Sequence, residues 1–253
     1  MPASRTTLVL GAMPSEVRVI QAALRQRGSG MLACFPYATG TINGRKVVVA
    51  VTGVGVTNGA MVAALFIQRF KPGALVVSGT GSRFNPRIRT GDTVVSTKTI
   101  HHAAGSLTNA GMVYRNVRGP LAGTMTAWFY KPDRELLLRA KAEMQTYEPD
   151  EIAVDGNTYR PRVLTGVVCA SDMFGVSDEK IADLKVKLDP DIMEMESAAI
   201  AQVAQQLGTP HIVFRAGSNR TQSDPGSDYR RLGQIAARAA ARWTVHYVGT
   251  LPR

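Results

Sequence analysis

Short apolar runs alternate with longer stretches of helical spacing from one end of the chain to the other. The apolar runs predict buried strands at residues 6–10, 46–51, 74–78, 93–100, 163–169 and 211–215. Helical spacing predicts helices at 14–28, 60–70, 132–147, 177–188, 196–207 and 229–248. Residues 103–123, rich in glycine, asparagine and threonine, predict a loop or irregular structure. The alternation predicts an α/β fold, and the absence of repeats or linkers predicts a single domain over residues 1–253.

One predicted helix begins with a carboxylate on the face that should be buried. Glu194 and Glu196 lie in a run that is otherwise apolar or small, and Glu196 begins an apolar stripe at helical spacing. The rest of this stripe consists of Ile200, Val203 and Leu207. A buried carboxylate is costly unless it is hydrogen-bonded or used by a ligand. The alternative is a helix-start carboxylate satisfied by the free N–H groups and the dipole of the first turn.

Other polar or small residues follow the predicted strands. Glu16 comes just after the first strand, where open α/β sheets place their chemistry, although a first-turn carboxylate also compensates the helix dipole. The loop 52–59 has the spacing GxGxxxG, which suits either a phosphate or close packing of helix on strand. Thr80 and Gly81 follow a third strand, where small residues let a ligand approach backbone N–H groups.

The chain is basic, with 30 lysine and arginine residues against 19 acidic ones and a net charge of +11. Its arginines are scattered, and no basic run with interleaved aromatics appears, so we expect no nucleic-acid partner. No apolar run is long enough to span a bilayer and no signal sequence is evident, so we expect no membrane partner and a cytoplasmic location. Cys34 and Cys169 suit a reducing compartment or core packing. His101 and His102 would point to opposite faces of a strand, so we predict no metal site and no cofactor.

Two motifs stand out in specificity, the stretch Met193-Glu194-Met195-Glu196-Ser197-Ala198-Ala199-Ile200-Ala201 and the stretch Arg215-Ala216-Gly217-Ser218-Asn219. With Gly11-Ala12-Met13, Gly53-Val54-Gly55, the loop 79–82, Gly91-Asp92 and Ser171-Asp172-Met173-Phe174, they cover most of the chain. Through these residues the chain resembles the nucleoside phosphorylase/nucleosidase superfamily. Within that superfamily it looks most like the 5′-methylthioadenosine/S-adenosylhomocysteine nucleosidases.

The resemblance implies a fold, an activity and an assembly. The fold is a three-layer α/β/α sandwich with a mixed, partly barrel-like central sheet. The activity is hydrolysis of the N-glycosidic bond of purine nucleosides or 5′-thio-substituted adenosines, so the expected partner is a small-molecule purine nucleoside. The working unit is a homodimer or a larger homo-oligomer.

The resemblance also implies roles for individual residues. Glu16 matches the carboxylate that orients and activates the attacking water, and Glu196 matches the residue that holds the ribose hydroxyls. Carboxylates there stabilise the oxocarbenium-like sugar of the transition state. Met195 matches the residue that packs on the sugar, and Phe174 the aromatic that stacks on the base. The other residues expected to contact the substrate are Thr80, Gly81, Glu194, Arg215 and Ser218.

Two positions depart from the pattern of the nucleosidases. The family carries an aspartate after the serine, to protonate the purine at N7, and this chain has Asn219. An amide donates a hydrogen bond but delivers no proton, so a catalytic role for Asn219 implies a different mode of base recognition, as in phosphorylases selective for 6-oxopurines. Arg83 replaces a small residue and could add a contact to an anion.

Three alternatives to a hydrolase stay open at this point. A phosphorylase would use phosphate in place of water, although Glu16 would repel phosphate. A nucleoside-binding or storage-type protein would keep the fold without the acid. A dinucleotide-dependent oxidoreductase is disfavoured, because no acidic residue follows the glycine loop at the distance needed to hold a ribose.

Overall fold

The structure is a computed structural model that describes residues 6–109, 111–173, 177–221 and 225–252. Its helices are α1 (Pro14–Ala23), α2 (Val56–Phe70), α3 (Arg134–Glu143), α4 (Asp178–Lys187), α5 (Ser197–Gln206) and α6 (Pro225–Thr250). The strands of the large sheet are β1 (Thr7–Gly11), β2 (Arg25–Leu32), β3 (Phe35–Ile42), β4 (Arg45–Val51), β5 (Ala74–Arg83), β6 (Thr93–His101), β11 (Phe129–Tyr130), β14 (Val163–Ala170), β15 (Ile192–Glu194) and β16 (His211–Arg220). Three separate hairpins consist of β7 (Gly105–Thr108) with β8 (Gly111–Tyr114), β9 (Val117–Arg118) with β10 (Met125–Thr126), and β12 (Ile152–Val154) with β13 (Asn157–Tyr159).

The large sheet is mixed and partly closed. Its strand order is β11-β6-β14-β15-β5-β1-β4-β3-β2, and β16 pairs with both β5 and β6. Strands β5, β15, β14, β6 and β16 therefore form a ring. Strand β16 runs parallel to β5 but antiparallel to β6, and β1 runs parallel to β4 and β5. The expected α/β fold with a mixed, partly barrel-like sheet is confirmed.

Alternation along the central strands builds two apolar faces. On β1, Leu8 and Leu10 pack with α2 and α5, whereas Val9 packs on the other face with α1 and α6. Successive side chains of a strand point to opposite faces, so strands covered on both sides must be apolar throughout. This is why the buried strands read as continuous apolar runs in the sequence.

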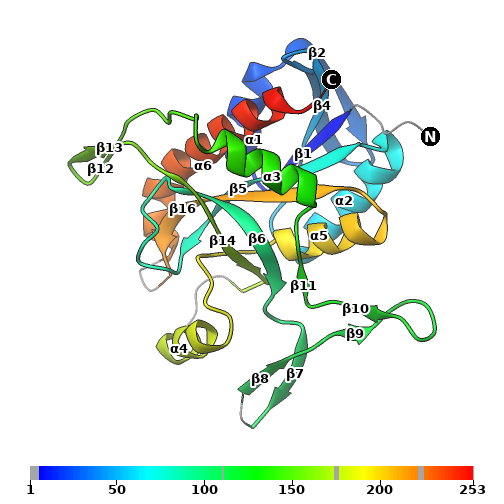
Figure 1. The fold of residues 1–253 in the computed structure, drawn as a ribbon, viewed down its shortest axis with the longest axis vertical. Helices are drawn as coiled ribbons and strands as arrows, with labels where there is room; N and C mark the ends of the chain where they lie inside the picture. The colour runs from blue at the N-terminus through cyan, green and yellow to red at the C-terminus, as the bar shows by residue number, and fades with distance from the viewer. Residues whose placement is uncertain (1–5, 110, 174–176, 222–224, 253) are drawn as a thin grey trace.

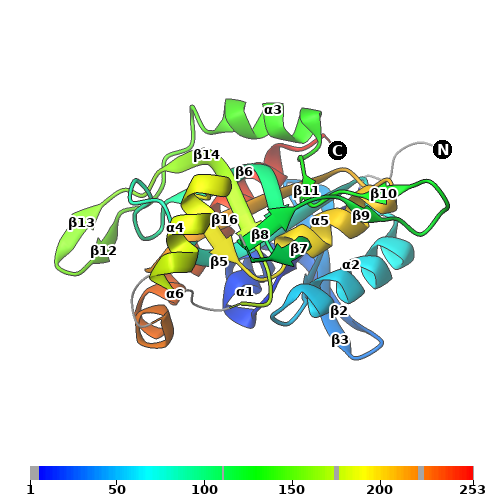
Figure 2. The same ribbon diagram turned by 90° about the horizontal axis from the view of Figure 1, so that it is seen from below.

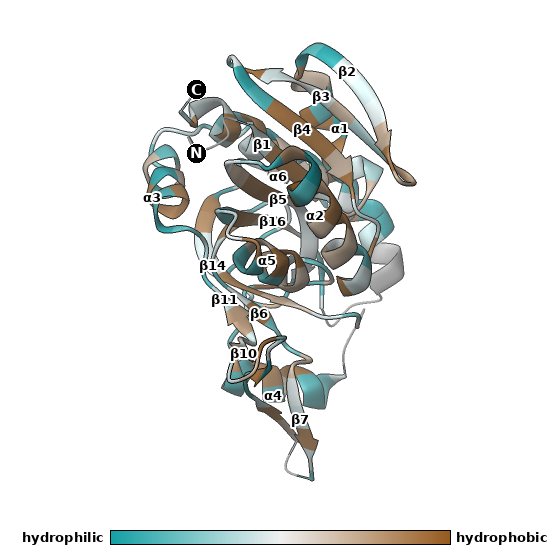
Figure 3. Cartoon of the chain, turned by 90° about the vertical axis from the view of Figure 1, so that its right-hand side faces the viewer, coloured by the Kyte–Doolittle hydropathy of each residue, from teal (hydrophilic) through white to brown (hydrophobic). Residues whose placement is uncertain are grey.

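The helices form layers on either side of this sheet. Figure 1 shows α1 and α6 on one side of β1, β5 and β16, with α2 and α5 on the other. Helices α2 and α5 lie side by side in Figure 2, and Figure 3 shows apolar residues concentrated on the strands between the layers. Helix α4 and the hairpin β7–β8 project from this body (Figures 1 and 3). Within the described part of the chain, no helix combines the length and apolarity needed to cross a membrane.

Several predictions made from the sequence differ from the structure. Helix α1 ends at Ala23 rather than near Gly28, because Leu24 is extended and the chain enters the hairpin β2–β3. The polar, largely exposed residues of β2 carry no apolar alternation that could have revealed this hairpin. Residues 103–123, predicted to be a loop or irregular structure, contain the hairpin β7–β8 and the strand β9, which pairs with β10 just beyond them. The stripe headed by Glu196 is buried at Ile200, but Leu207 at its end is 39% exposed.

Candidate active site

A cavity of about 370 Å³ opens beside the carboxyl ends of β1 and β5. Parallel pairing of β1 and β16 with β5 brings these strand ends to one edge of the sheet, where α/β sheets commonly bind ligands. The predicted site residues that line the cavity are Glu16, Thr80, Gly81, Glu194, Met195, Glu196, Ser218 and Asn219. The predicted aromatic Phe174 lies outside the described residues. The volume suits a small molecule rather than a macromolecular segment.

Glu16 is held by four donors at the end of the cavity formed by α1 and β5. Its Oε2 accepts from the backbone N–H of Ala12 at 2.7 Å and of Met13 at 3.1 Å. Its Oε1 accepts from the backbone N–H of Thr80 at 2.7 Å and from the Thr80 hydroxyl at 2.9 Å. Burial raises the pKa of Glu16, and the Glu196 carboxylate adds to this rise, whereas Arg215 and Thr80 oppose it. A buried, well-oriented carboxylate with a raised pKa is suited to act as a general base near neutral pH.

Arg215 connects three buried carboxylates. Its Nη2 lies 2.5 Å from Glu194 Oε2 and 3.0 Å from Glu196 Oε2, and its Nη1 lies 4.0 Å from Glu16 Oε1. Its Nε donates to the Ser197 hydroxyl at 3.0 Å. Burial alone would lower the pKa of Arg215, but the three carboxylates outweigh it and raise that pKa above its ordinary value. Arg215 is only 1% exposed and is not among the residues that line the cavity, so its described contacts are with the carboxylates, and its predicted contact with a substrate stays a prediction.

Glu194 and Glu196 are positioned by the start of α5 and by the glycine loop. Glu194 accepts from the backbone N–H groups of Glu196 and Ser197, at 2.9 and 3.0 Å, which satisfies donors of the first helical turn. Burial raises the pKa of Glu194, against the opposing effect of Arg215. Glu196 accepts from the backbone N–H of Gly55 at 3.0 Å, so one oxygen binds the loop while the other binds Arg215. We call Glu16, Glu194, Glu196 and Arg215 the carboxylate end of the cavity.

One glycine is required by this arrangement. A Cβ atom at Gly79 would collide with the guanidinium of Arg215 and lie 2.7 Å from Glu16 Oε1. Gly79, the small residue that follows the third predicted strand, therefore leaves room for the Arg215 guanidinium and the Glu16 carboxylate. We expect any side chain at this position to separate Arg215 from Glu16.

The glycine loop 52–59 uses its N–H groups within the protein. Gly53 N–H donates to the Ala12 carbonyl, Gly55 N–H to Glu196, and Val56 N–H to Asp172 at 2.7 Å. These donors are the groups that a phosphate-binding loop would present to its ligand. The loop therefore positions Glu196 and Asp172 rather than a phosphate, which argues against a dinucleotide site.

The uncharged polar part of the cavity lining, which we call the amide end, consists of Ser218 and Asn219 on β16. The Ser218 hydroxyl lies 2.9 Å from the Gly81 carbonyl and 2.9 Å from Asn219 Oδ1. Asn219 Nδ2 donates to the Arg220 carbonyl at 3.1 Å. An amide carries two N–H donors, and the second has no partner among the described residues. Asn219 can therefore donate a hydrogen bond to a molecule in the cavity.

Several residues of the cavity were not expected from the sequence. The most informative is Tyr229 near the start of α6, whose Oη lies 3.3 Å from the Thr80 hydroxyl and 3.6 Å from Met13 Sδ. It was predicted only as the first residue of the last helix. No periodicity or motif connects residues 149 positions apart, so the sequence carried no signal for this contact.

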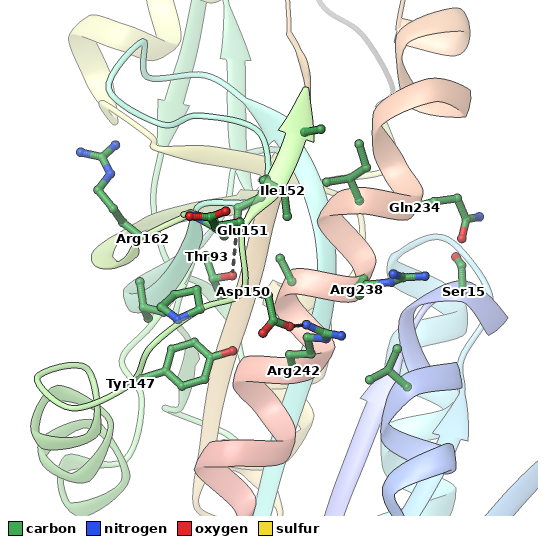
Figure 4. Close-up of a pocket in the computed structure, with 18 of the residues that line it drawn as sticks. Ser15, Thr93, Tyr147, Asp150, Glu151, Ile152, Arg162, Gln234, Arg238 and Arg242 are labelled. Atoms are coloured by element: carbon green, nitrogen blue, oxygen red, sulfur yellow. Dashed lines mark hydrogen bonds and ion pairs between the residues drawn. The ribbon is translucent and has the colours of Figure 1, made fainter. Parts of the chain in front are cut away.

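A larger cavity, of about 680 Å³, lies between α1, α6 and residues 147–153 (Figure 4). Its charged side chains are exposed, and two of them pair with each other. Arg242 forms an ion pair with Asp150, and Arg162 points away from the cavity and binds Asp92. None of the carboxylates that line it is buried. This cavity is larger than the first, but its exposed and charged lining is that of a solvated surface.

A metal site finds no support in the described residues, where no three histidine, cysteine, aspartate or glutamate side chains gather closely enough to hold an ion. His102 is buried, and its Nε2 lies 2.7 Å from the Ser171 hydroxyl. Burial lowers the pKa of His102 to about 4, so the ring is neutral at physiological pH.

Comparison with known proteins agrees with this geometry. The family model described as the phosphorylase superfamily matches residues 6–248. A 5′-methylthioadenosine/S-adenosylhomocysteine nucleosidase of Geobacillus thermodenitrificans (strain NG80-2) is 28% identical over 235 residues, which cover 92% of this chain and 92% of the relative. A nucleosidase of the same name from Bacillus licheniformis is 31% identical over 212 residues, covering 83% of this chain and 84% of the relative.

A solved structure shares the same fold. The 5′-methylthioadenosine/S-adenosylhomocysteine nucleosidase of Neisseria meningitidis, in complex with methylthio-immucillin-A, superimposes with a TM-score of 0.83 and 25% identity. The alignment covers 98% of this chain and 100% of that one. Together with the family match over nearly the whole length, this similarity shows that the chain belongs to the phosphorylase superfamily.

Proposed function

We propose that the protein hydrolyses the N-glycosidic bond of purine nucleosides, with 5′-thio-substituted adenosines as the leading substrate class. The observation that carries this proposal is the Glu16 carboxylate, which is buried, accepts four hydrogen bonds and lines a cavity of nucleoside size. The relatives reported above are named as nucleosidases of methylthioadenosine and S-adenosylhomocysteine, which supports this substrate class.

In the proposed reaction Glu16 takes a proton from the attacking water. The bond from the anomeric carbon to the base nitrogen breaks, its electron pair leaves with the base, and the sugar becomes oxocarbenium-like before the water oxygen bonds to that carbon. The departing base takes its proton from solvent, because the amide of Asn219 delivers none. Glu196 accepts hydrogen bonds from the ribose hydroxyls, and Met195 packs on the sugar. Negative charge from the carboxylate end stabilises the positive sugar in the transition state.

The same carboxylate argues against phosphorolysis. The backbone donors of Ala12, Met13 and Thr80 could bind an anion, but they already hold Glu16. A phosphate placed there would have to displace a buried carboxylate and would face Glu194 and Glu196 as well. Repulsion between like charges is strong in a site of low dielectric constant. Water, which is neutral, is therefore the favoured nucleophile.

Asn219 supports a second substrate class within the same activity. Its spare N–H can donate to N7 of a purine, and its position next to Ser218 lets the amide orient the base. The 6-oxopurine nucleosides are therefore candidate substrates alongside the adenosine derivatives. In either case Asn219 provides recognition rather than a proton.

We further propose a homo-oligomeric, cytoplasmic protein. Helix α2 exposes Met61 at 43% and Leu65 at 37%, which a partner subunit would cover. Cys34 is exposed and unpaired, and such a thiol suits a reducing compartment. Light scattering on the purified protein reports the number of subunits directly.

The test is base release from a nucleoside panel. Purified protein is incubated with adenosine, 5′-methylthioadenosine, S-adenosylhomocysteine and inosine, and free base is quantified by chromatography. We expect release from at least one of them, and loss of that release in Glu16→Gln. Absence of free base from all four substrates would overturn the proposed function.

A further inference from the structure

Tyr229 of α6 lies in the active-site cavity beside residues to which the proposed function gives roles. Its ring is partly buried, and its hydroxyl lies 3.3 Å from the Thr80 hydroxyl. The Thr80 hydroxyl in turn lies 2.9 Å from Glu16 Oε1. Three side chains from α6, β5 and α1 therefore form a continuous chain of oxygen atoms that ends on the proposed base.

The protons that each hydroxyl carries determine which group donates in each of these hydrogen bonds. An ionised Glu16 can only accept, so the single proton of the Thr80 hydroxyl points to Glu16 Oε1. The Thr80 oxygen then has only lone pairs to offer Tyr229, which must act as the donor. The competing acceptor for the Tyr229 proton is Met13 Sδ at 3.6 Å, and a thioether is a weak acceptor. The order of donation is therefore Tyr229 to Thr80 to Glu16.

A glycine one turn along α6 makes room for the ring of Tyr229. A Cβ atom at Gly233 would lie 2.9 Å from Cζ and 3.0 Å from Cε2 of Tyr229. Glycine inside a helix is unfavourable relative to alanine, so its presence here calls for a packing reason. The ring of Tyr229 provides that reason, because it lies directly over the position where a methyl group would stand.

We propose that Tyr229 is a positioning residue for the reaction, which acts through Thr80 to orient and tune Glu16 and for whose ring Gly233 leaves room. This inference rests on the proposed function for the role of Glu16. A Thr80 hydroxyl that accepts from Tyr229 is a stronger donor to Glu16, because linked hydrogen bonds polarise one another. The stronger donation favours the ionised, base-competent form of Glu16.

Other groups around Glu16 are compatible with this role. The charged groups that face it are Arg215 of β16 and Glu196 at the start of α5, and we expect both to stay in place when Tyr229 is altered. Burial raises the pKa of Tyr229, so the phenol remains a neutral donor at physiological pH. The effect of Tyr229 on Glu16 can therefore be measured against a constant background.

The experiment titrates the Glu16 carboxyl carbon by carbon-13 NMR in the full-length protein, with the signal assigned by its loss in Glu16→Gln. In parallel, kcat/KM is measured as a function of pH. In Tyr229→Phe we expect the Glu16 titration and the acid limb of kcat/KM to move up together by roughly 0.3 pH unit, the size expected when one linked hydrogen bond is lost. Thr80→Val should move both by roughly one pH unit or more, because it removes the bond to the carboxylate itself.

The variant Gly233→Ala separates the effect of the position of the Tyr229 ring from an effect on the stability of the protein. It leaves the Tyr229 hydroxyl in the protein but displaces the ring, so both curves should move in the same direction as in Tyr229→Phe. Its melting temperature should not fall, because alanine favours the helix and a tyrosine ring can swing aside. One matched control is Tyr130→Phe, because the Tyr130 hydroxyl binds Gln202. The other is Gly249→Ala, which lies on α6 like Gly233 but whose added methyl group would meet Asn43, between β3 and β4. Both controls should leave the titration unchanged.

The two proposals fail in different ways. Loss of base release by the wild-type protein would overturn the proposed function, while the NMR titration would still report the link between Tyr229 and Glu16. A Glu16 titration that is identical in the wild type, Tyr229→Phe and Gly233→Ala would overturn the positioning role of Tyr229, whatever the activity.

Discussion

The two ends of the active-site cavity are built on opposite principles. At the carboxylate end, Glu16 accepts four hydrogen bonds and Arg215 contacts three carboxylates, all of them nearly inaccessible to solvent. At the amide end, Ser218 and Asn219 bind each other and two backbone carbonyls, and Asn219 keeps an N–H donor without a partner among the described residues. One end is charged, buried and held by many hydrogen bonds, and the other is neutral with a spare donor.

This difference assigns the chemistry to one end and the choice of base to the other. Charges fixed in a buried network need no reorganisation as positive charge develops on the sugar, which is how electrostatic catalysis works. A neutral amide supplies orientation and selectivity but no proton. Substitutions at the carboxylate end should therefore abolish turnover, whereas substitutions at the amide end should alter which nucleoside is preferred.

The largest effect is expected from Arg215→Met. This change leaves three buried carboxylates without their shared cation, a situation that costs about 3–5 kcal/mol of stability. We expect a large fall in melting temperature and no measurable base release at 25 °C. Thermal unfolding followed by circular dichroism, with Arg87→Met as a control at a half-exposed ion pair, measures the difference. Equal melting temperatures for the two variants would contradict the role of Arg215 as the centre of the network.

Glu196→Gln should separate catalysis from folding. The substitution is nearly isosteric, but it removes the negative charge that stabilises the ribose in the transition state. This loss should raise the activation free energy by roughly 3 kcal/mol, which lowers the rate about a hundredfold. Steady-state kinetics together with a melting curve provide the measurement. Glu151→Gln, at a carboxylate that is 60% exposed, is the matched control. A Glu196→Gln variant with turnover near that of the wild type would remove Glu196 from the mechanism.

Asn219→Asp probes the amide end. Restoring a carboxyl group should raise cleavage of adenosine and methylthioadenosine by about tenfold, less than the roughly hundredfold of a well-placed general acid, because the surroundings are adapted to an amide. Inosine should gain less, since Asn219 can already bind its base. Kinetics on the three nucleosides check the ranking. A lower rate on all three would mean that the site is built around the amide and that an acid has no place in it.

The dependence on pH should differ between activity and stability. Burial raises the pKa of Glu16 and of Glu194, so activity that needs an ionised Glu16 rises as pH increases through its raised pKa. The folded state then binds more protons than the unfolded state above pH 4.5, so the stability contributed by these groups declines as pH rises through the same window. Rate and melting temperature measured from acid to neutral pH should show opposite trends. An acid limb at or below pH 4.5 would contradict the raised pKa of Glu16.

The sequence revealed the carboxylate end only in part. Glu16 and Glu196 could be singled out because each is a carboxylate next to a buried strand or helix face, where charge needs a reason. The position of Arg215 behind the carboxylates could not be predicted, because a strand residue gives no indication of which distant side chains it meets. The link from Tyr229 to Thr80 depends on how α6 crosses the sheet. The same holds for the hairpin β2–β3, whose polar residues carry no periodic signal and which forms through pairing alone.

The sugar product formed at saturating phosphate tests the central claim most directly. If Glu16 occupies the donors that would otherwise bind an anion, water is the nucleophile whatever the phosphate concentration. We predict free ribose, or its 5′-substituted form, as the product, with a rate that does not change when phosphate is added. A sugar 1-phosphate as the main product, formed at a rate that rises with phosphate, would contradict this account of Glu16.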